Sequence, residues 1–120
     1  MSMTKITVVL LADAETHEAM GRAANAFELV KEAKEARNDV ELILDGAATR
    51  WARELAKPDH KLRGLFDVVR DKVSGVCEYC AGAFGVKEAV RAAGLPLVGE
   101  FDGHPSLAKR IADGRQVVTF

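Results

Sequence analysis

The chain has 120 residues, of which 48% are hydrophobic and 29% are charged, and its net charge is −1. These values are typical of one globular domain with its own core, so we expect residues 1–120 to form a single domain. The near-neutral charge argues against a nucleic-acid partner, and the apolar runs are shorter than the about 20 residues that cross a membrane.

Five short segments rich in β-branched and aliphatic residues are predicted to be strands, at residues 6–12, 40–44, 73–79, 95–98 and 116–120. The first is almost continuously apolar, as in a strand that is covered on both faces within a parallel sheet. The fourth contains Pro96, which favours an edge position because proline has no backbone N–H to donate to a neighbouring strand.

Helices are predicted between these strands, at residues 15–37, 47–56, 60–72, 80–84, 86–93 and 105–112. The first carries alanines at helical spacing. We expect Asp13 to cap this helix and Asn38 to stop it. Asp59 is expected to cap the third helix, and either His104 or Asp102 the last one.

Strands and helices alternate along the chain, which predicts right-handed crossovers and a three-layer α/β/α fold with a five-stranded parallel sheet. Ligands of such sheets bind outside the carboxyl ends of the strands. Polar or reactive side chains follow these ends: Asp13, Asp45, the Cys77–Cys80 segment and His104. The strand order cannot be deduced from the sequence, so it is open which of them meet.

Cys77 and Cys80 form a C-x-x-C pair, the most distinctive chemical feature of the chain. Cys80 is predicted to begin a helix, whose amide groups would stabilise a thiolate and lower its pKa. The spacing allows a disulfide, or a persulfide on one sulfur that the other resolves. No secretion signal is recognised, so we expect a cytoplasmic protein, in which such a pair is more often redox-active, catalytic or metal-binding than a structural disulfide.

Other kinds of site have less support. A closed zinc site needs four ligands, whereas one C-x-x-C pair supplies two and the histidines are far apart in the sequence, so no metal or other cofactor is expected. A thioredoxin-like site would follow the first strand, and no glycine-rich phosphate loop is present. His17, His104, Asp13 and Asp45 are candidates for lining the site, although capping and turn roles also account for them.

The segment V-C-E-Y-C-A-G-A-F-G-V, residues 76–86, resembles the DsrE/DsrF-like family. The shared pattern is a cysteine at the end of the third strand, small residues in a helical turn, and then a glycine. The closing G-R-Q-V-V-T-F, residues 114–120, is similar to the end of that family's last helix and its final strand. The resemblance implies a five-stranded parallel sheet between helices, assembled as a homotrimer or a larger ring such as a homohexamer.

By position, Cys77 matches the family's sulfur-accepting cysteine, and Cys80 matches a second cysteine found in one branch. The resemblance implies a sulfur-relay or thiol-redox protein that takes sulfane sulfur from a donor protein and passes it to an acceptor. The amide groups at the predicted helix start favour Cys80 instead, so it is open which of the two sulfurs is the primary one. A second hypothesis is a non-catalytic module for small-ligand binding or oligomeric assembly with structural cysteines; whether the chain is a sulfurtransferase-like enzyme stays open.

Overall fold

The computed structural model describes residues 3–120, so Met1 and Ser2 of the predicted single domain lie outside the described residues. At its centre is a five-stranded parallel sheet in the order β4-β3-β2-β1-β5. The strands are β1 (Lys5–Leu10), β2 (Asp39–Leu44), β3 (Val73–Cys77), β4 (Leu97–Val98) and β5 (Gln116–Thr119). The predicted α/β fold is confirmed, and β4, which follows Pro96, is an edge strand as predicted.

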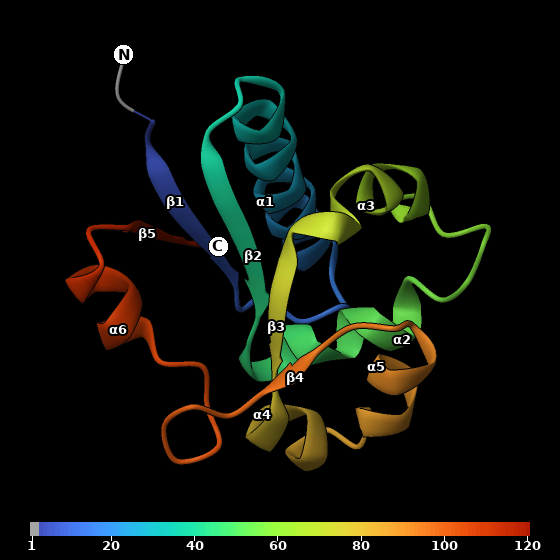
Figure 1. Cartoon of the computed structure of the whole chain (residues 1–120). Coiled ribbons are helices and arrows are strands. Elements are labelled where there is room, and N and C mark those ends of the chain that lie inside the picture. The colour runs from blue at the N-terminus through green and yellow to red at the C-terminus, as the bar shows by residue number, and fades with distance from the viewer. Residues whose placement is uncertain (1–2) are drawn as a thin grey trace.

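The helices join the strands in chain order (Figure 1). They are α1 (His17–Glu35), α2 (Trp51–Glu54), α3 (Arg63–Val69), α4 (Glu78–Ala83), α5 (Lys87–Ala92) and α6 (Leu107–Ala112), with short 3-10 helices η1 (Gly46–Arg50) and η2 (Arg70–Lys72). The connections from β1 to β4 all progress in one direction across the sheet, whereas the connection through α6 runs back to β5. Because such crossovers are right-handed, α6 lies on the opposite face from α1.

The main hydrophobic core lies between α1 and the sheet. Phe27 and Val30 of α1 are fully buried against alternate strand residues, which include Val8, Leu10, Leu42, Leu44 and Val76. The Phe27 ring also packs against Phe66 of α3, with the ring centroids 5.5 Å apart. Trp51 is buried, with its indole N–H donating to the carbonyl of Ala12 at 3.0 Å.

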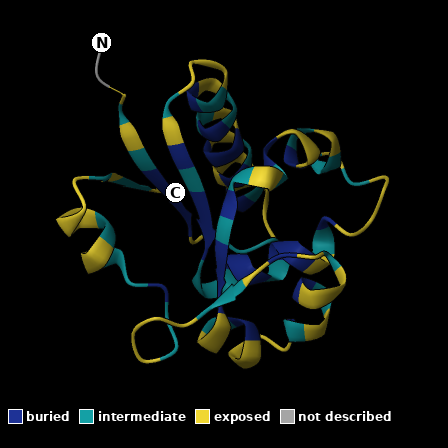
Figure 2. Ribbon diagram, viewed as in Figure 1, coloured by how far each residue is buried: buried dark blue, intermediate teal, exposed yellow. Residues whose placement is uncertain are grey.

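The other face of the sheet is covered differently, because α6 contributes no buried residue (Figure 2). Polar contacts connect this part of the chain to the sheet. Arg110 of α6 and Arg115 approach the Glu41 carboxylate of β2 at 3.3 and 3.1 Å, and the Thr7 hydroxyl of β1 donates to it at 2.5 Å. Ion pairs that are shielded from water interact more strongly than surface pairs, so this network holds α6 and the residue before β5 against the sheet.

The start of α1 differs from the prediction. Thr16 caps the helix, since its hydroxyl accepts the N–H of Ala19 at 3.0 Å, and the expected cap Asp13 lies outside the helix. Threonine is one of the preferred cap residues, and Thr16 directly precedes the first helical residue, His17. At the other end, Asn38 donates its backbone N–H to the carbonyl of Ala33 at 2.9 Å, so the chain leaves the helix where predicted.

Two further capping predictions are wrong. Ser106 caps α6, so neither His104 nor Asp102 does, because both belong to a turn that ends before the helix. Leu62 occupies the cap position of α3 without a side-chain hydrogen bond, and Asp59 lies outside the helix. The predicted second and third helices are also shorter and partly of 3-10 type, and all strands except β2 are shorter than predicted.

Substituting Glu41→Gln should lower the free energy of unfolding at neutral pH by about 2 kcal/mol, because the two arginines lose their shared anion. Burial raises the pKa of Glu41, but the hydroxyls of Ser74 and Thr7 and the charges of Arg110 and Arg115 outweigh burial and hold that pKa below 4.5. The stabilisation is therefore present above pH 4.5 and is lost as the pH falls through the folded-state value.

Urea denaturation at several pH values measures this difference, which should shrink at acid pH. Glu88→Gln is the matched control, because Glu88 is an exposed carboxylate paired with Arg91 at 2.7 Å and should contribute little. Equal losses in the two variants, or a Glu41 effect that does not change with pH, would contradict the role given to the buried network.

Candidate functional site

The two cysteines lie where β3 ends and α4 begins. β3 ends at Cys77 and α4 starts at the next residue, so the prediction that the strand continues to residue 79 and that Cys80 opens the helix is wrong. Glu78 is favourable in a first helical turn and alanines follow it, which draws Tyr79 into the helix. Cys77 therefore holds the cap position, and its sulfur accepts the N–H of Cys80 at 3.4 Å.

A tight turn after β4 directs His104 towards this junction. Phe101 and His104 exchange two backbone hydrogen bonds of 2.9 and 2.8 Å around Asp102 and Gly103. Both central residues have positive φ, 51° and 82°, as in the two-residue turn that Asp-Gly favours. The N–H of Tyr79 donates to the carbonyl of Gly103 at 2.9 Å, which fixes the turn against α4.

His104 contacts both sulfurs. Its Nδ1 atom lies 3.2 Å from Sγ of Cys77 and 4.0 Å from Sγ of Cys80. The imidazole also packs against the Tyr79 ring, with centroids 5.0 Å apart, which restricts its orientation. One ring nitrogen therefore faces the thiols and is in reach of their protons.

Asp45 completes the group from the neighbouring strand. It follows β2, and its Oδ1 atom lies 3.7 Å from Sγ of Cys80 while accepting the N–H of Gly46 at 2.8 Å. Because β2 and β3 are parallel neighbours, their carboxyl ends meet at the same edge. One potential ligand atom from each of the four residues lies within 4.8 Å of the other three. We call Asp45, Cys77, Cys80 and His104 the cysteine cluster.

Asp13 and His17, also predicted to line the site, are not part of the cysteine cluster. The carboxylate of Asp13 pairs with Arg50 at 3.1 Å. His17 is the first residue of α1 and is exposed. The structure thus brings together four of the six candidate residues, and a role for the other two stays a prediction.

The two thiols differ in exposure and environment. Cys77 is fully buried and Cys80 is half-buried, and both are free thiols. The pKa of Cys77 is raised to about 12, mainly by burial and also by the Cys80 side chain and the charge of Asp45. The hydrogen bond from the Cys80 amide lowers this pKa, but its effect is weaker than that of burial. Cys77 is therefore a neutral thiol at physiological pH, with Cys80 the sulfur that solvent reaches.

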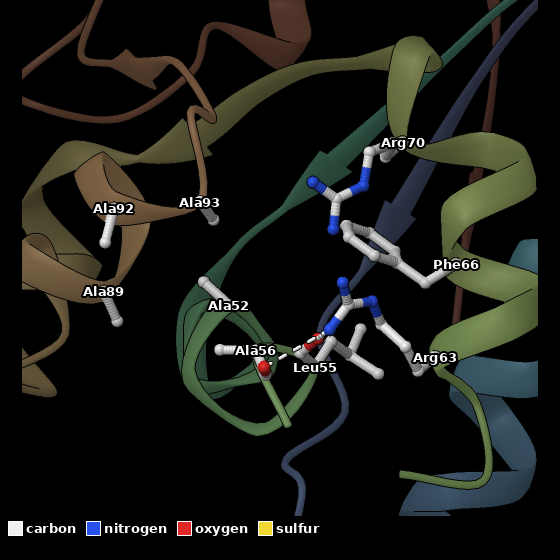
Figure 3. A pocket seen from close by; sticks show the side chains of 9 residues that line it. All are labelled: Ala52, Leu55, Ala56, Arg63, Phe66, Arg70, Ala89, Ala92 and Ala93. Carbon is white, nitrogen blue, oxygen red and sulfur yellow. Dashed lines mark hydrogen bonds between the residues drawn. The ribbon is translucent and has the colours of Figure 1, made fainter. Parts of the chain in front are cut away.

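A separate pocket of 240 Å³ lies between α2, α3 and α5 (Figure 3). Its lining combines several alanines with Phe66, Arg63 and Arg70. The guanidinium group of Arg63 is engaged, since it donates to the carbonyls of Leu55 and Ala56 at 3.2 Å each. No residue of the cysteine cluster lines this pocket, so it is a distinct feature of the molecule.

The fold and the cysteine cluster define an α/β protein with two thiols at the carboxyl end of a parallel sheet. The sequence matches the DsrE/DsrF-like family over residues 5–120, so the chain belongs to this family, as the resemblance indicated. The family suggests a function of the sulfur-relay type and relay partners. No helix within residues 3–120 has the length and apolar character needed to span a membrane.

Two of the similar proteins are described as uncharacterised or of unknown function. The uncharacterized protein MJ0733 of Methanocaldococcus jannaschii is 38% identical over 87 residues, which are 72% of this chain and 70% of that protein. Two solved structures share the fold. BT1422 from Bacteroides thetaiotaomicron, a conserved protein of unknown function, has a TM-score of 0.63 at 13% identity, covering 95% of this chain and 94% of that one. The ychN protein from E. coli has a TM-score of 0.61 at 20% identity, covering 98% of this chain and 100% of that one.

Alkylation by iodoacetamide should distinguish the two thiols. In Cys80→Ser, where Cys77 alone remains, reaction near neutral pH should be at least tenfold slower than in Cys77→Ser, because a buried thiol of raised pKa supplies little thiolate. Mass spectrometry of quenched time points gives both rates. Similar rates in the two folded variants would show that Cys77 is not shielded.

Gly103→Ala should displace the turn and expose Cys77. At φ 82° an alanine is strained, and its Cβ would also lie 3.2 Å from Cβ of Tyr79. Gly114→Ala is the matched control, because Gly114 has φ 80° but open space around it. Gly114→Ala should lower the free energy of unfolding by about 1–2 kcal/mol, because alanine is strained in the left-handed conformation. Gly103→Ala should lower it by more, because of the added contact with Tyr79. Only Gly103→Ala should speed alkylation of Cys77; an equal rate in the two variants would contradict this role of the turn.

Proposed function

We propose that this protein accepts sulfane sulfur from a donor protein on its cysteine pair and passes it to an acceptor protein. The observation that supports this proposal is the pairing of a half-buried thiol with a buried one beside His104, at the edge of the sheet where α/β proteins bind ligands. Membership of the DsrE/DsrF-like family adds independent support, because that family suggests sulfur relay.

Cys80 is assigned to the first step because it is the more exposed sulfur. Its thiol proton passes to Nδ1 of His104, 4.0 Å from the sulfur. The Cys80 thiolate then attacks the outer sulfur of a donor persulfide, R–S–SH. The S–S bond of the donor breaks, and its electron pair leaves with the donor sulfur as a thiolate. This thiolate takes the proton from His104, and Cys80 is left as the persulfide Cys80–S–SH. An acceptor thiolate repeats the same displacement, so sulfur moves without net oxidation.

Cys77 is assigned a resolving role, which reverses the order implied by its position in the family. Its sulfur lies within 4.8 Å of that of Cys80. When the Cys77 thiol passes its proton to Nδ1 of His104, 3.2 Å away, its sulfur attacks the inner sulfur of Cys80–S–SH, forms a Cys77–Cys80 disulfide and expels hydrosulfide. The disulfide then needs two electrons from a cellular dithiol to return to the starting state. This branch is the thiol-redox form of the proposed function.

Exposed aromatic side chains next to the cysteine cluster offer a docking surface for a relay partner. Tyr79 is 62% exposed, Phe101 67% and Phe84 41%, and all three belong to α4, its end or the turn that carries His104. Large exposed aromatics are common at protein interfaces. The proposal also retains a cytoplasmic location and a homotrimer or homohexamer as the working assembly.

The second candidate function is a non-catalytic module for small-ligand binding or oligomeric assembly. The complete burial of Cys77 favours it, because buried thiols are often only small core residues. In that case neither sulfur would take up sulfane sulfur, and replacing both cysteines by serine would leave binding or assembly intact.

Incubation with a cysteine desulfurase and cysteine, in the presence of a metal chelator, tests the proposal. Intact-mass spectrometry should show a gain of one sulfur atom on the wild type and on Cys77→Ser, and none on Cys80→Ser. His104→Gln should load at least tenfold more slowly, since the group that takes the thiol proton is missing.

The matched control is His17→Gln, an exposed histidine outside the cysteine cluster, which should load like the wild type. Loading of Cys80→Ser but not of Cys77→Ser would reverse the assigned order. No loading of any variant, while a known acceptor is loaded in parallel, would reject sulfur acceptance and leave the non-catalytic module.

A further inference from the structure

We propose that the cysteine cluster is a binding site for one Zn²⁺ ion, held by Sγ of Cys77 and Cys80, Nδ1 of His104 and a carboxylate oxygen of Asp45. No metal was expected from the sequence, because one C-x-x-C pair supplies only two ligands. The fold supplies the other two from β2 and from the turn after β4. This inference goes beyond sulfur relay and does not depend on it.

The spacing of the four atoms suits a tetrahedral ion. With Zn–S bonds of about 2.3 Å and Zn–N or Zn–O bonds of about 2.0–2.2 Å, neighbouring ligand atoms around a tetrahedral zinc lie roughly 3.3–3.8 Å apart. His104 Nδ1 lies 3.2 Å from Cys77 Sγ and 4.0 Å from Cys80 Sγ, and Cys80 Sγ lies 3.7 Å from Asp45 Oδ1. All four ligand atoms lie within 4.8 Å of one another, so closing the widest separation around an ion takes side-chain shifts of up to about 1 Å.

The chemistry of the ligands selects the ion. Two thiolates with one imidazole and one carboxylate form a mixed S₂NO set that suits zinc, whereas magnesium and calcium require mainly oxygen ligands. On binding, the two thiols release their protons to solvent, and no electron is transferred. The charge of the ion, +2, then offsets two of the three negative charges of the two thiolates and the Asp45 carboxylate.

Surrounding contacts hold these ligands in place. The N–H of Cys80 points at the Cys77 sulfur at 3.4 Å, and such a donor favours the thiolate form that binds metal. The N–H of Gly46 orients the Asp45 carboxylate at 2.8 Å. The Tyr79 ring packs on the imidazole of His104 and leaves Nδ1 facing the sulfurs. Four ligands from three segments are therefore positioned before any ion arrives.

Zinc and sulfane sulfur would compete for the same two sulfurs. A thiolate that donates its electron pair to zinc is a poorer nucleophile, so the zinc-loaded protein should accept sulfur more slowly than the metal-free protein. The two proposals nevertheless have separate readouts, since metal content is measured without a sulfur donor and sulfur loading is measured in chelator.

The experiment uses the full chain, stripped with a chelator, reduced and titrated with Zn²⁺ and, in parallel, with Co²⁺. We expect one zinc per chain by elemental analysis. With Co²⁺ we expect intense visible bands of a tetrahedral ion and near-ultraviolet thiolate-to-cobalt charge transfer. Asp45→Asn and His104→Gln should each weaken metal binding at least tenfold. Cys80→Ser should lower the intensity of the thiolate-to-cobalt charge transfer, because one of the two thiolate ligands is missing.

Asp13→Asn and His17→Gln are the matched controls, because they change the same residue types at the same end of the sheet but outside the cysteine cluster. Far-ultraviolet circular dichroism establishes that each variant is folded. Failure of the folded wild type to bind zinc, a cobalt spectrum without thiolate charge transfer, or equal weakening in the Asp13 and His17 controls would overturn the proposal. Sulfur acceptance would remain testable in each of these cases.

Discussion

The hydrogen bond from the N–H of Tyr79 to the carbonyl of Gly103 is the contact on which the site depends. It joins the first turn of α4 to the turn after β4, two segments that follow the neighbouring strands β3 and β4. Without it, Cys77 would lose its cover and His104 its position beside the sulfurs. The left-handed conformations of Asp102 and Gly103 form the turn that makes this contact possible, so they help to position His104 at the end of β3.

The two faces of the sheet are stabilised by different forces. On the face of α1, aliphatic and aromatic side chains exclude water, and the stabilisation scales with buried apolar area. On the face of α6, Glu41 and two arginines supply polar contacts, although Val9 and Ile43 of the sheet are fully buried there as well. The cysteine cluster lies at the carboxyl ends of β2 and β3 and receives its histidine from the segment that leads into α6. The polar face therefore influences the site more directly than the hydrophobic core does.

The sequence predicted the strands and their parallel arrangement, because β-branched runs alternate with helical patterns along the chain. It also singled out the C-x-x-C pair, because that pair is a local pattern. It could not predict that Asp45 and His104 would meet them, because that depends on which strands are neighbours. The Asp-Gly pair before His104 was a readable turn signal. The start of α4 was misplaced by two residues, since Tyr79 suits a strand as well as a helix, and that error exchanged the roles of Cys77 and Cys80 at the helix start.

The outer strands of the sheet are short, two residues in β4 and four in β5. Such edges offer another polypeptide few free backbone donors and acceptors, and Pro96 removes one donor beside β4. The architecture thereby protects itself against templated β-aggregation, even though its strands are strongly apolar. Association between copies would have to proceed through helices and loops, which leaves side-chain identity, not backbone pairing, to determine the partner.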